Sequence, residues 1–127
     1  MLAIIIVSWN TRDLLDRCLA SVDSSLDGAG IGYQVIVVDN ASSDGTAAMV
    51  RERYSRAMLI EAGRNLGFAG GNNLALRRLL SDPQCAEIRH IFLLNPDAEI
   101  VDGAIPLLVR YLDEHPDTMV VGPRLRY

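Results

Sequence analysis

Three apolar runs of this chain each stop abruptly at polar residues. The runs cover residues 4–7, 35–38 and 91–94. The polar residues that follow them are Ser8, Trp9, Asn10, Asp39, Asn40, Asn95 and Asp97. Short runs rich in Ile and Val are typical of buried parallel strands, and an open α/β sheet binds its ligand beyond the carboxyl ends of such strands. We therefore expect three strand ends to present polar groups at one edge.

Longer segments with apolar residues at helical spacing separate these runs, which is the pattern of βαβ units. We expect strands at residues 2–8, 33–39, 58–61, 91–94 and 119–121. We expect helices at residues 11–26, from a cap at Ser42 or Ser43 to about 55, from the segment 64–73 to 81, and at 102–114. The fold class is then α/β: a Rossmann-like, mostly parallel sheet flanked by helices on both faces, in three layers, as a single domain over residues 1–127.

The charged residues exclude several classes of function. All 12 cationic residues are Arg, so a P-loop lysine and a Schiff-base lysine are absent from this chain. The net charge is -4 and no basic run is present, so we expect no nucleic-acid partner. Cys18 and Cys85 lack metal-ligand spacing and fit core thiols in a reducing cytoplasm. The apolar run at residues 2–7 is too short to cross a membrane.

Asp39 follows four apolar residues, so its carboxylate needs a hydrogen-bond donor or a cation. One interpretation is structural: the carboxylate binds backbone amides of the turn at residues 42–45. The other is that it binds a ligand. The sequence alone leaves both open.

Asp97 stands beyond the end of an expected strand, because Pro96 keeps Asn95 extended and projects the carboxylate past the sheet. One carboxylate together with the phosphates of a ligand is a common way to hold Mg²⁺ or Mn²⁺. This arrangement favours a diphosphate ligand. The alternative is a turn in which Asp97 caps the next segment, and Asp102 is an equal candidate to cap the later helix.

The glycine-rich segment 67–73 can bring backbone close to a ligand and present the amides of a helix N-terminus to a phosphate or a sugar hydroxyl. The alternative is tight packing at a helix entry. No GxGxxG follows the first strand, which disfavours a dinucleotide site. Trp9 has two interpretations as well: it stacks on a base or fills the sheet edge.

Together these motifs resemble the family 2 glycosyltransferases. The resemblance spans the whole chain, in order, over residues 5–10, 37–46, 65–73 and 93–97. The form Asn-Leu-Gly-Phe-Ala-Gly-Gly-Asn-Asn at residues 65–73 looks most like the rhamnosyltransferase branch. The resemblance implies a GT-A fold whose first half binds a nucleotide sugar and a divalent metal.

The resemblance also assigns roles to positions of this chain. Residues 8–10 would contact the base, Asp39 a pyrimidine, Asn95 the ribose, and Asp97 a Mn²⁺ or Mg²⁺ ion. Two departures stand out: Asn95 replaces the first acidic residue of the DxD motif, and residues 71–73 lack an Arg that would contact the donor, for which Arg64 is the substitute candidate. The further candidates for donor binding are Asn40, Gly67, Gly71 and Asn72.

Family members usually run to about twice this length, and their second half supplies the acceptor site and the catalytic base. The resemblance thus implies the donor-binding half of an inverting transferase acting in cell-surface polysaccharide synthesis in the cytoplasm or at the inner face of the membrane. It would move a sugar, rhamnose being the candidate, from a dTDP- or UDP-sugar to a saccharide or lipid-linked acceptor. The alternative is a non-catalytic nucleotide-binding or regulatory module.

Self-association is a further expectation. It would use an apolar face of the last helix formed by Leu107, Leu108, Tyr111 and Leu112. The alternative is that this helix packs entirely on the sheet.

Overall fold

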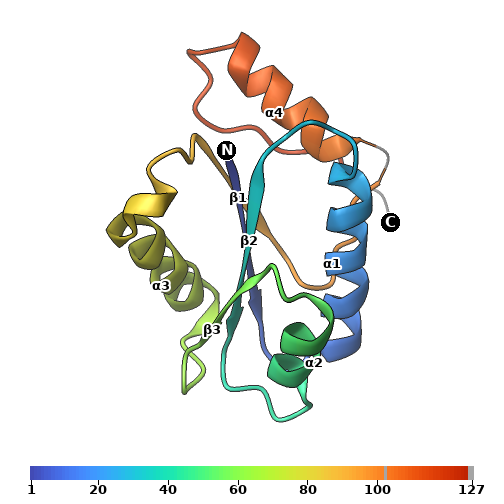
Figure 1. Cartoon of the computed structure of the whole chain (residues 1–127), viewed down its shortest axis with the longest axis vertical. Coiled ribbons are helices and arrows are strands. Elements are labelled where there is room, and N and C mark those ends of the chain that lie inside the picture. Colours follow the sequence, from blue (N-terminus) through green and yellow to red (C-terminus); the bar gives the residue numbers. More distant parts are fainter. Residues whose placement is uncertain (102, 126–127) are drawn as a thin grey trace.

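A parallel four-stranded sheet forms the centre of the protein, in the order β3-β2-β1-β4 (Figure 1). The computed structural model describes residues 1–101 and 103–125. The strands are β1 (Leu2–Ser8), β2 (Tyr33–Asp39), β3 (Met58–Glu61) and β4 (His90–Leu94). The helices are α1 (Arg12–Leu26), α2 (Thr46–Arg53), α3 (Gly67–Ser81) and α4 (Ala104–Glu114), with a 3₁₀ turn η1 (Pro83–Cys85). The predicted α/β class is confirmed.

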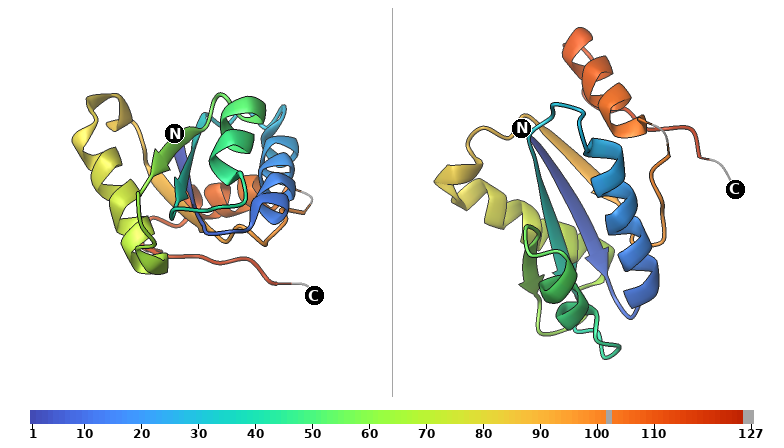
Figure 2. Two further views of the ribbon diagram at one scale, coloured as in Figure 1. Left: turned by 90° about the horizontal axis from the view of Figure 1, so that it is seen from below. Right: turned by 45° about the vertical axis from the view of Figure 1, so that its right-hand side comes forward.

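Helices cover both faces of the sheet, as predicted. Seen along the strands, α3 lies on one side and α1 and α2 lie on the other (Figure 2). Alternate side chains of β1 enter the two cores: Ile4 and Ile6 pack on the α1 side, and Ile5 packs on the α3 side. Because both faces are covered, nearly every side chain of β1 is buried.

The connection from β3 to β4 determines where the site lies. The chain leaves β3 at one edge of the sheet, crosses the opposite face as α3, and returns as β4 beside β1. The strand order therefore reverses between β1 and β4, the place where α/β sheets bind ligands. The register pairs Ser8 with Asp39, and Ile6 with Leu94. We call the side of the sheet at which these strands end the carboxyl edge.

The start of α2 differs from the prediction. Neither Ser42 nor Ser43 caps it; the helix begins at Thr46, and the Asp44 carboxylate accepts a hydrogen bond from the Thr46 N–H at 3.1 Å. The reason is the left-handed turn at Gly45, with φ of 84°, which brings Asp44 back over the first turn.

The predicted fifth strand is wrong. Residues 119–121 are irregular, and the side chains of Met119 and Val120 are 87% exposed. Their apolar composition favours a strand, but a strand forms only where a partner strand accepts its hydrogen bonds. The described part of the predicted last helix is α4; Asp102, its candidate cap, lies outside the described residues.

The interpretation that α4 packs entirely on the sheet is also wrong. Ile105 is its one fully buried residue, whereas Leu107 and Tyr111 are exposed and Leu108 and Leu112 are half-buried. The helix contacts α1 and lies at the amino end of β4, where Asp113 binds His90.

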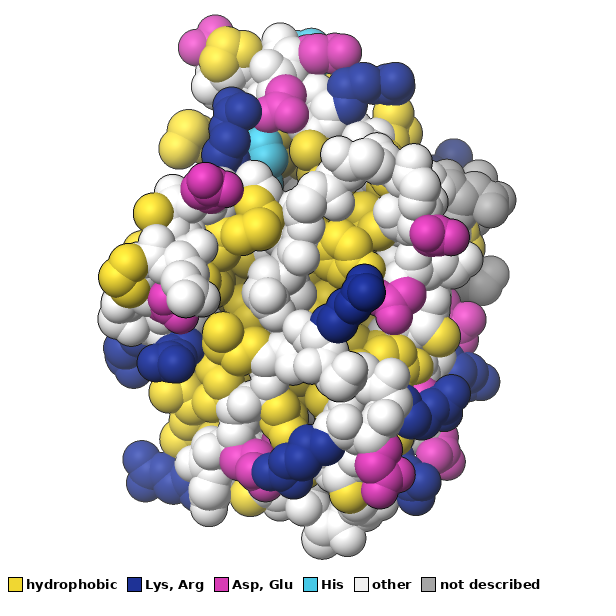
Figure 3. Space-filling model, in the orientation of Figure 1, with side chains coloured by type: hydrophobic (Ala, Val, Ile, Leu, Met, Phe, Trp, Pro, Cys, Tyr) yellow, Lys and Arg dark blue, Asp and Glu magenta, His cyan; other side chains and the backbone are white. Residues whose placement is uncertain are grey.

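Charged side chains of both signs are spread over the surface (Figure 3). On the face shown in Figure 3, side chains of both charges are interspersed around apolar strips, without a continuous basic patch. Among residues 1–101 and 103–125, no helix has the length and apolarity that a bilayer span requires.

Gly71 offers a test of the close contact between α3 and β1. A Cβ at this buried position would lie 2.6 Å from Cγ1 and 3.0 Å from Cγ2 of Val7. We expect Gly71→Ala to lower the free energy of unfolding by about 1–3 kcal/mol in urea titrations, because overpacking outweighs the gain in helix propensity.

Gly122→Ala is the matched control, since a Cβ there meets nothing within 4 Å. It should change the free energy of unfolding by less than about 0.5 kcal/mol. Equal stability of the two variants would contradict the packing account of Gly71.

Candidate functional site

The structure brings the predicted strand-end residues to the carboxyl edge. Asp39 ends β2 directly beside Ser8, the last residue of β1. Asn95 and Asp97 follow β4 on the other side of β1. The expected clustering of polar groups at the point where the strand order reverses follows from the parallel pairing alone.

Asp39 is buried, with 3% of its surface exposed. Both carboxylate oxygens accept from the same backbone N–H, that of Ser42, at 3.3 Å. The structural interpretation of Asp39 is thus realised, but one long shared contact leaves a carboxylate with most of its acceptor capacity unused by the described residues. A buried carboxylate in this condition favours a further donor from a ligand.

Asn40 connects the end of β2 to the start of α3. Its Nδ2 donates to the Gly67 carbonyl at 3.1 Å, and the Gly67 N–H donates to Oδ1 of Asn65 at 2.9 Å. Gly67 has φ of +70°, which explains the glycine. The buried Oδ1 of Asn40 has no partner among the described residues and adds a second acceptor with unused capacity.

The loop after β1 presents Trp9 outward. The residue is 54% exposed, so the interpretation in which Trp9 fills the sheet edge is wrong. Ser8 is fully buried, and its hydroxyl shares a 2.8 Å hydrogen bond with that of Thr11. Its carbonyl accepts the Asn40 N–H at 2.9 Å, which ties the end of β1 to the end of β2.

Asn95 and Asp97 are both exposed beyond β4. The Asp97 carboxylate accepts no hydrogen bond from the described residues, so the capping interpretation has no support in the structure. No three His, Cys, Asp or Glu side chains gather within the described ranges in a way that could hold a metal. Asp97 therefore fits an ion shared with a ligand's phosphates and does not fit an ion held by protein groups alone.

Residues of the glycine-rich segment 67–73 differ in which interpretation they fit, tight packing at the helix entry or approach to a ligand. Gly71 is buried against Val7, and Asn72 is 5% exposed with its Nδ2 donating to the Phe68 carbonyl at 2.9 Å. For these two residues the structure shows the tight-packing alternative. Gly67 remains at the surface, and Arg64 is exposed and forms no ion pair with the described residues.

Two residues near the site were missed by the sequence analysis. Phe68, at the start of α3, is 60% exposed. Asp44 binds the first residues of both α1 and α2. The Asp-Gly pair at residues 44–45 was the available signal for the second, since Asp commonly bonds backbone two residues on.

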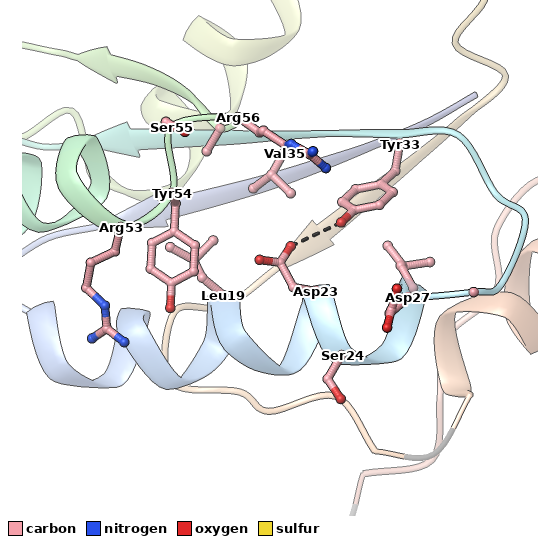
Figure 4. Close-up of a pocket in the computed structure, with 13 residues that line it drawn as sticks. Leu19, Asp23, Ser24, Asp27, Tyr33, Val35, Arg53, Tyr54, Ser55 and Arg56 are labelled. Atoms are coloured by element: carbon pink, nitrogen blue, oxygen red, sulfur yellow. Dashed lines mark hydrogen bonds between the residues drawn. The ribbon is translucent and has the colours of Figure 1, made fainter.

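A cavity of about 690 Å³ lies elsewhere, between α1 and the segment that enters β3 (Figure 4). Tyr33, at the start of β2, donates its hydroxyl to Asp23 there at 3.1 Å. Tyr54 and Arg53 on its rim bind Asp16. The residues that line it include none of the predicted strand-end residues, so it is separate from the carboxyl edge.

Comparison with known families now adds to this geometry. Residues 3–127 match the family described as Glycosyl transferase family 2. The chain belongs to this family.

Among curated proteins, this family 2 chain is 26% identical over 132 residues to the N-acetylglucosaminyl-diphospho-decaprenol L-rhamnosyltransferase of Mycobacterium tuberculosis. The match covers 99% of this chain and 41% of that protein. The chain thus spans less than half the length of this relative.

Solved structures agree on the fold. Residues 1–349 of TarS from S. aureus superpose with a TM-score of 0.72 at 21% identity, covering 91% of this chain and 33% of that one. The mannosyltransferase PcManGT from Pyrobaculum calidifontis, in complex with GDP-Man and Mn²⁺, gives a TM-score of 0.72 at 26% identity, covering 87% and 32%. The GT-A expectation is confirmed.

The two free thiols test the packing behind the site. Burial, and then the nearby carboxylates of Asp97 and Glu99, raise the pKa of the Cys18 thiol to about 12, whereas Cys85 is half-buried. Because the thiolate is the reactive form, we expect Ellman's reagent at pH 8 to modify Cys85 alone in the native protein.

Cys85→Ser should then show no reactive thiol until denaturant is added, and Cys18→Ala should react like the wild type. Rapid modification of Cys18 in the native Cys85→Ser variant would contradict this packing behind β4.

Proposed function

We propose that residues 1–127 form one domain, the donor-binding half of an inverting glycosyltransferase. The observation that carries the proposal is Asp39: a buried carboxylate with acceptor capacity left over, at the end of a strand beside the point where the strand order reverses. An exposed Trp9 and an exposed Asp97 lie on the same edge. A nucleoside diphosphate has groups that suit all three.

The nucleotide base would lie at the end of β2. Thymine and uracil carry a ring N–H that can donate a hydrogen bond to the Asp39 carboxylate. Trp9 offers an aromatic ring on which the base can stack. A dTDP- or UDP-sugar is thus the proposed donor. TarS is described in complex with UDP, and the mannosyltransferase with GDP-Man.

The diphosphate would lie towards β4. Asp97 would hold Mn²⁺ or Mg²⁺ jointly with the phosphates, and Asn95 would contact the ribose. When bound, such an ion stabilises the negative charge of the departing nucleoside diphosphate. Arg64 and the surface at Gly67 are the proposed further contacts to the donor.

The reaction would be a direct displacement. The acceptor hydroxyl loses its proton to a carboxylate base and bonds to the anomeric carbon, while the bond from that carbon to the diphosphate oxygen breaks with inversion. In this proposal the catalytic base and the acceptor site come from the part of such a transferase that this chain does not span. Likeness to the rhamnosyltransferase supports rhamnose as the sugar and a saccharide or lipid-linked acceptor, hence a role in cell-surface polysaccharide synthesis.

We propose that the protein acts in the cytoplasm or at the inner face of the membrane, a reducing compartment in which its two free cysteines would stay unpaired.

We also propose self-association through the exposed Leu107 and Tyr111 of α4. Sedimentation velocity tests it: Leu107→Ser with Tyr111→Ser should convert a concentration-dependent boundary into that of a monomer. A wild type that sediments as a monomer at all concentrations would contradict it.

One observation favours a second candidate. Among the described residues, no group of three His, Cys, Asp or Glu side chains that could hold a metal forms around Asp97. A non-catalytic nucleotide-binding or regulatory module would bind a nucleotide without a metal held by several protein ligands.

Calorimetric titration of dTDP, UDP and GDP tests the proposal. We expect Mn²⁺-dependent binding of a pyrimidine nucleotide, weakened at least about tenfold by Asp97→Ala, which corresponds to about 1.4 kcal/mol. Asp39→Ala should weaken binding with and without the ion, because it removes the acceptor for the nucleotide base.

The control is Asp117→Ala, an exposed carboxylate in the segment after α4, which should bind like the wild type. A folded wild-type chain that binds none of the three nucleotides would refute the donor-site proposal. Binding that does not depend on Mn²⁺ would favour the second candidate.

A further inference from the structure

Two loops at the carboxyl edge are fastened to each other by side chains. The Asn10 N–H donates to Oγ of Ser42 at 2.9 Å, and Oδ1 of Asn10 accepts from the Ser43 N–H at 2.8 Å. The Arg12 N–H donates to Oδ2 of Asp44 at 2.9 Å. We call these contacts the loop latch. It joins the loop after β1 to the loop after β2.

Both loops contain a residue in an unfavourable backbone conformation. Asn10 has φ of 52° and Ala41 has φ of 61°, and these are the two non-glycine residues with positive φ in the described part of the chain. Such conformations persist only where the surroundings hold them, and they concentrate at functional sites. The latch supplies that restraint at Asn10 directly, and at Ala41 through its neighbour Ser42.

The Asp44 carboxylate joins the starts of two helices. Oδ2 receives the Arg12 N–H of α1, while Oδ1 receives the N–H of Thr46 at 3.1 Å and its hydroxyl at 2.6 Å. Burial alone would raise the pKa of Asp44, but the hydrogen bonds from Thr46 and Arg12 outweigh burial and lower this pKa below its ordinary value. The carboxylate is therefore ionised at neutral pH and accepts on both oxygens.

Ser42 connects the latch to the proposed base contacts. Its N–H reaches the Asp39 carboxylate, and its hydroxyl receives the Asn10 N–H, next to Trp9. The carboxylate proposed to bind the base and the ring proposed to stack on it are thus linked through one serine. A shift of either loop would change their separation.

We propose that Asn10 and Asp44 are positioning residues for the nucleotide base, which act by fixing Trp9 relative to Asp39. This inference rests on the proposed function. The amide oxygen of Asn10 accepts from the Ser43 N–H, and in this proposal Asn10 acts through the loop and not by touching the base. That differs from the direct contact that the family resemblance implied for Asn10.

A pair of variants at Asn10 separates positioning from contact. Asn10→Gly suits the positive φ and removes the acceptor for Ser43; we expect it to weaken binding of uridine or thymidine about tenfold. Asn10→Asp keeps the acceptor and removes the amide donor; we expect affinity within about threefold of the wild type. The neutral nucleoside, followed by NMR shifts, avoids repulsion between the new charge and phosphates.

Asp44→Asn tests the other half of the latch. Arg12 and Thr46 bond to different oxygens of Asp44, and Asn has an acceptor oxygen at one of these two positions only, so one partner loses its acceptor. We expect a roughly tenfold loss of nucleoside affinity, with binding of Mn²⁺-pyrophosphate unchanged. The matched control is Asp13→Asn, an exposed carboxylate in the first turn of α1 outside the latch, which should change neither.

The outcomes are distinct. A wild type that binds neither nucleoside nor nucleotide overturns the proposed function, and the latch with it. A wild type that binds, with both Asn10→Gly and Asp44→Asn unchanged, overturns the latch alone. Equal loss of nucleoside and pyrophosphate binding in Asp44→Asn indicates general disruption and overturns positioning, as does loss of nucleoside binding in Asn10→Asp. If Asp44→Asn does not fold, the comparison of Asn10→Gly with Asn10→Asp still tests the positioning role.

Discussion

The burial of β1 on both faces is the constraint on which the rest of this protein depends. Ile4, Ile5 and Ile6 are fully enclosed, and the backbone of the same strand pairs with β2 on one side and β4 on the other. Unpaired backbone groups in such a place would be costly, so the parallel pairing is enforced. Parallel pairing in turn makes the three strands end together, and the polar residues after them have no other place to lie.

This constraint explains which parts of the fold could be predicted from sequence. The bounds of β1, β2 and β3 match the prediction. For β1 and β2 the reason is that an apolar run ending on polar residues marks a buried strand directly. Residues 119–121 are similarly apolar, but among the described residues no strand pairs with them, and composition does not encode a partner. The start of α2 depends on the left-handed turn at Gly45, a feature of local geometry that helix periodicity does not report.

For the candidate site, the sequence predicted where along the chain the site residues lie but not which way their side chains point. Strand ends placed Asp39 and Asp97 at one edge, but the inward turn of the Ser8 hydroxyl and of Asn72 depends on the neighbours that each meets in three dimensions. A family motif likewise assigns a role to a position without showing where its side chain points. Trp9 differs in the other direction. Core packing is the more common environment of a single Trp, but in the structure Trp9 is exposed.

The two ends of the candidate site differ in how far they are formed in advance. At the base end, Asp39 is buried and bonded, and the loop latch fixes the adjacent loops. At the other end, Asn95 and Asp97 are exposed, and the Asp97 carboxylate has no partner in the described part of the chain. Groups fixed before binding lose little conformational freedom when a ligand arrives, whereas free ones must be ordered at that moment. Selectivity for the base should therefore be inherent in this half, while the hold on the diphosphate should depend on the cation that accompanies it.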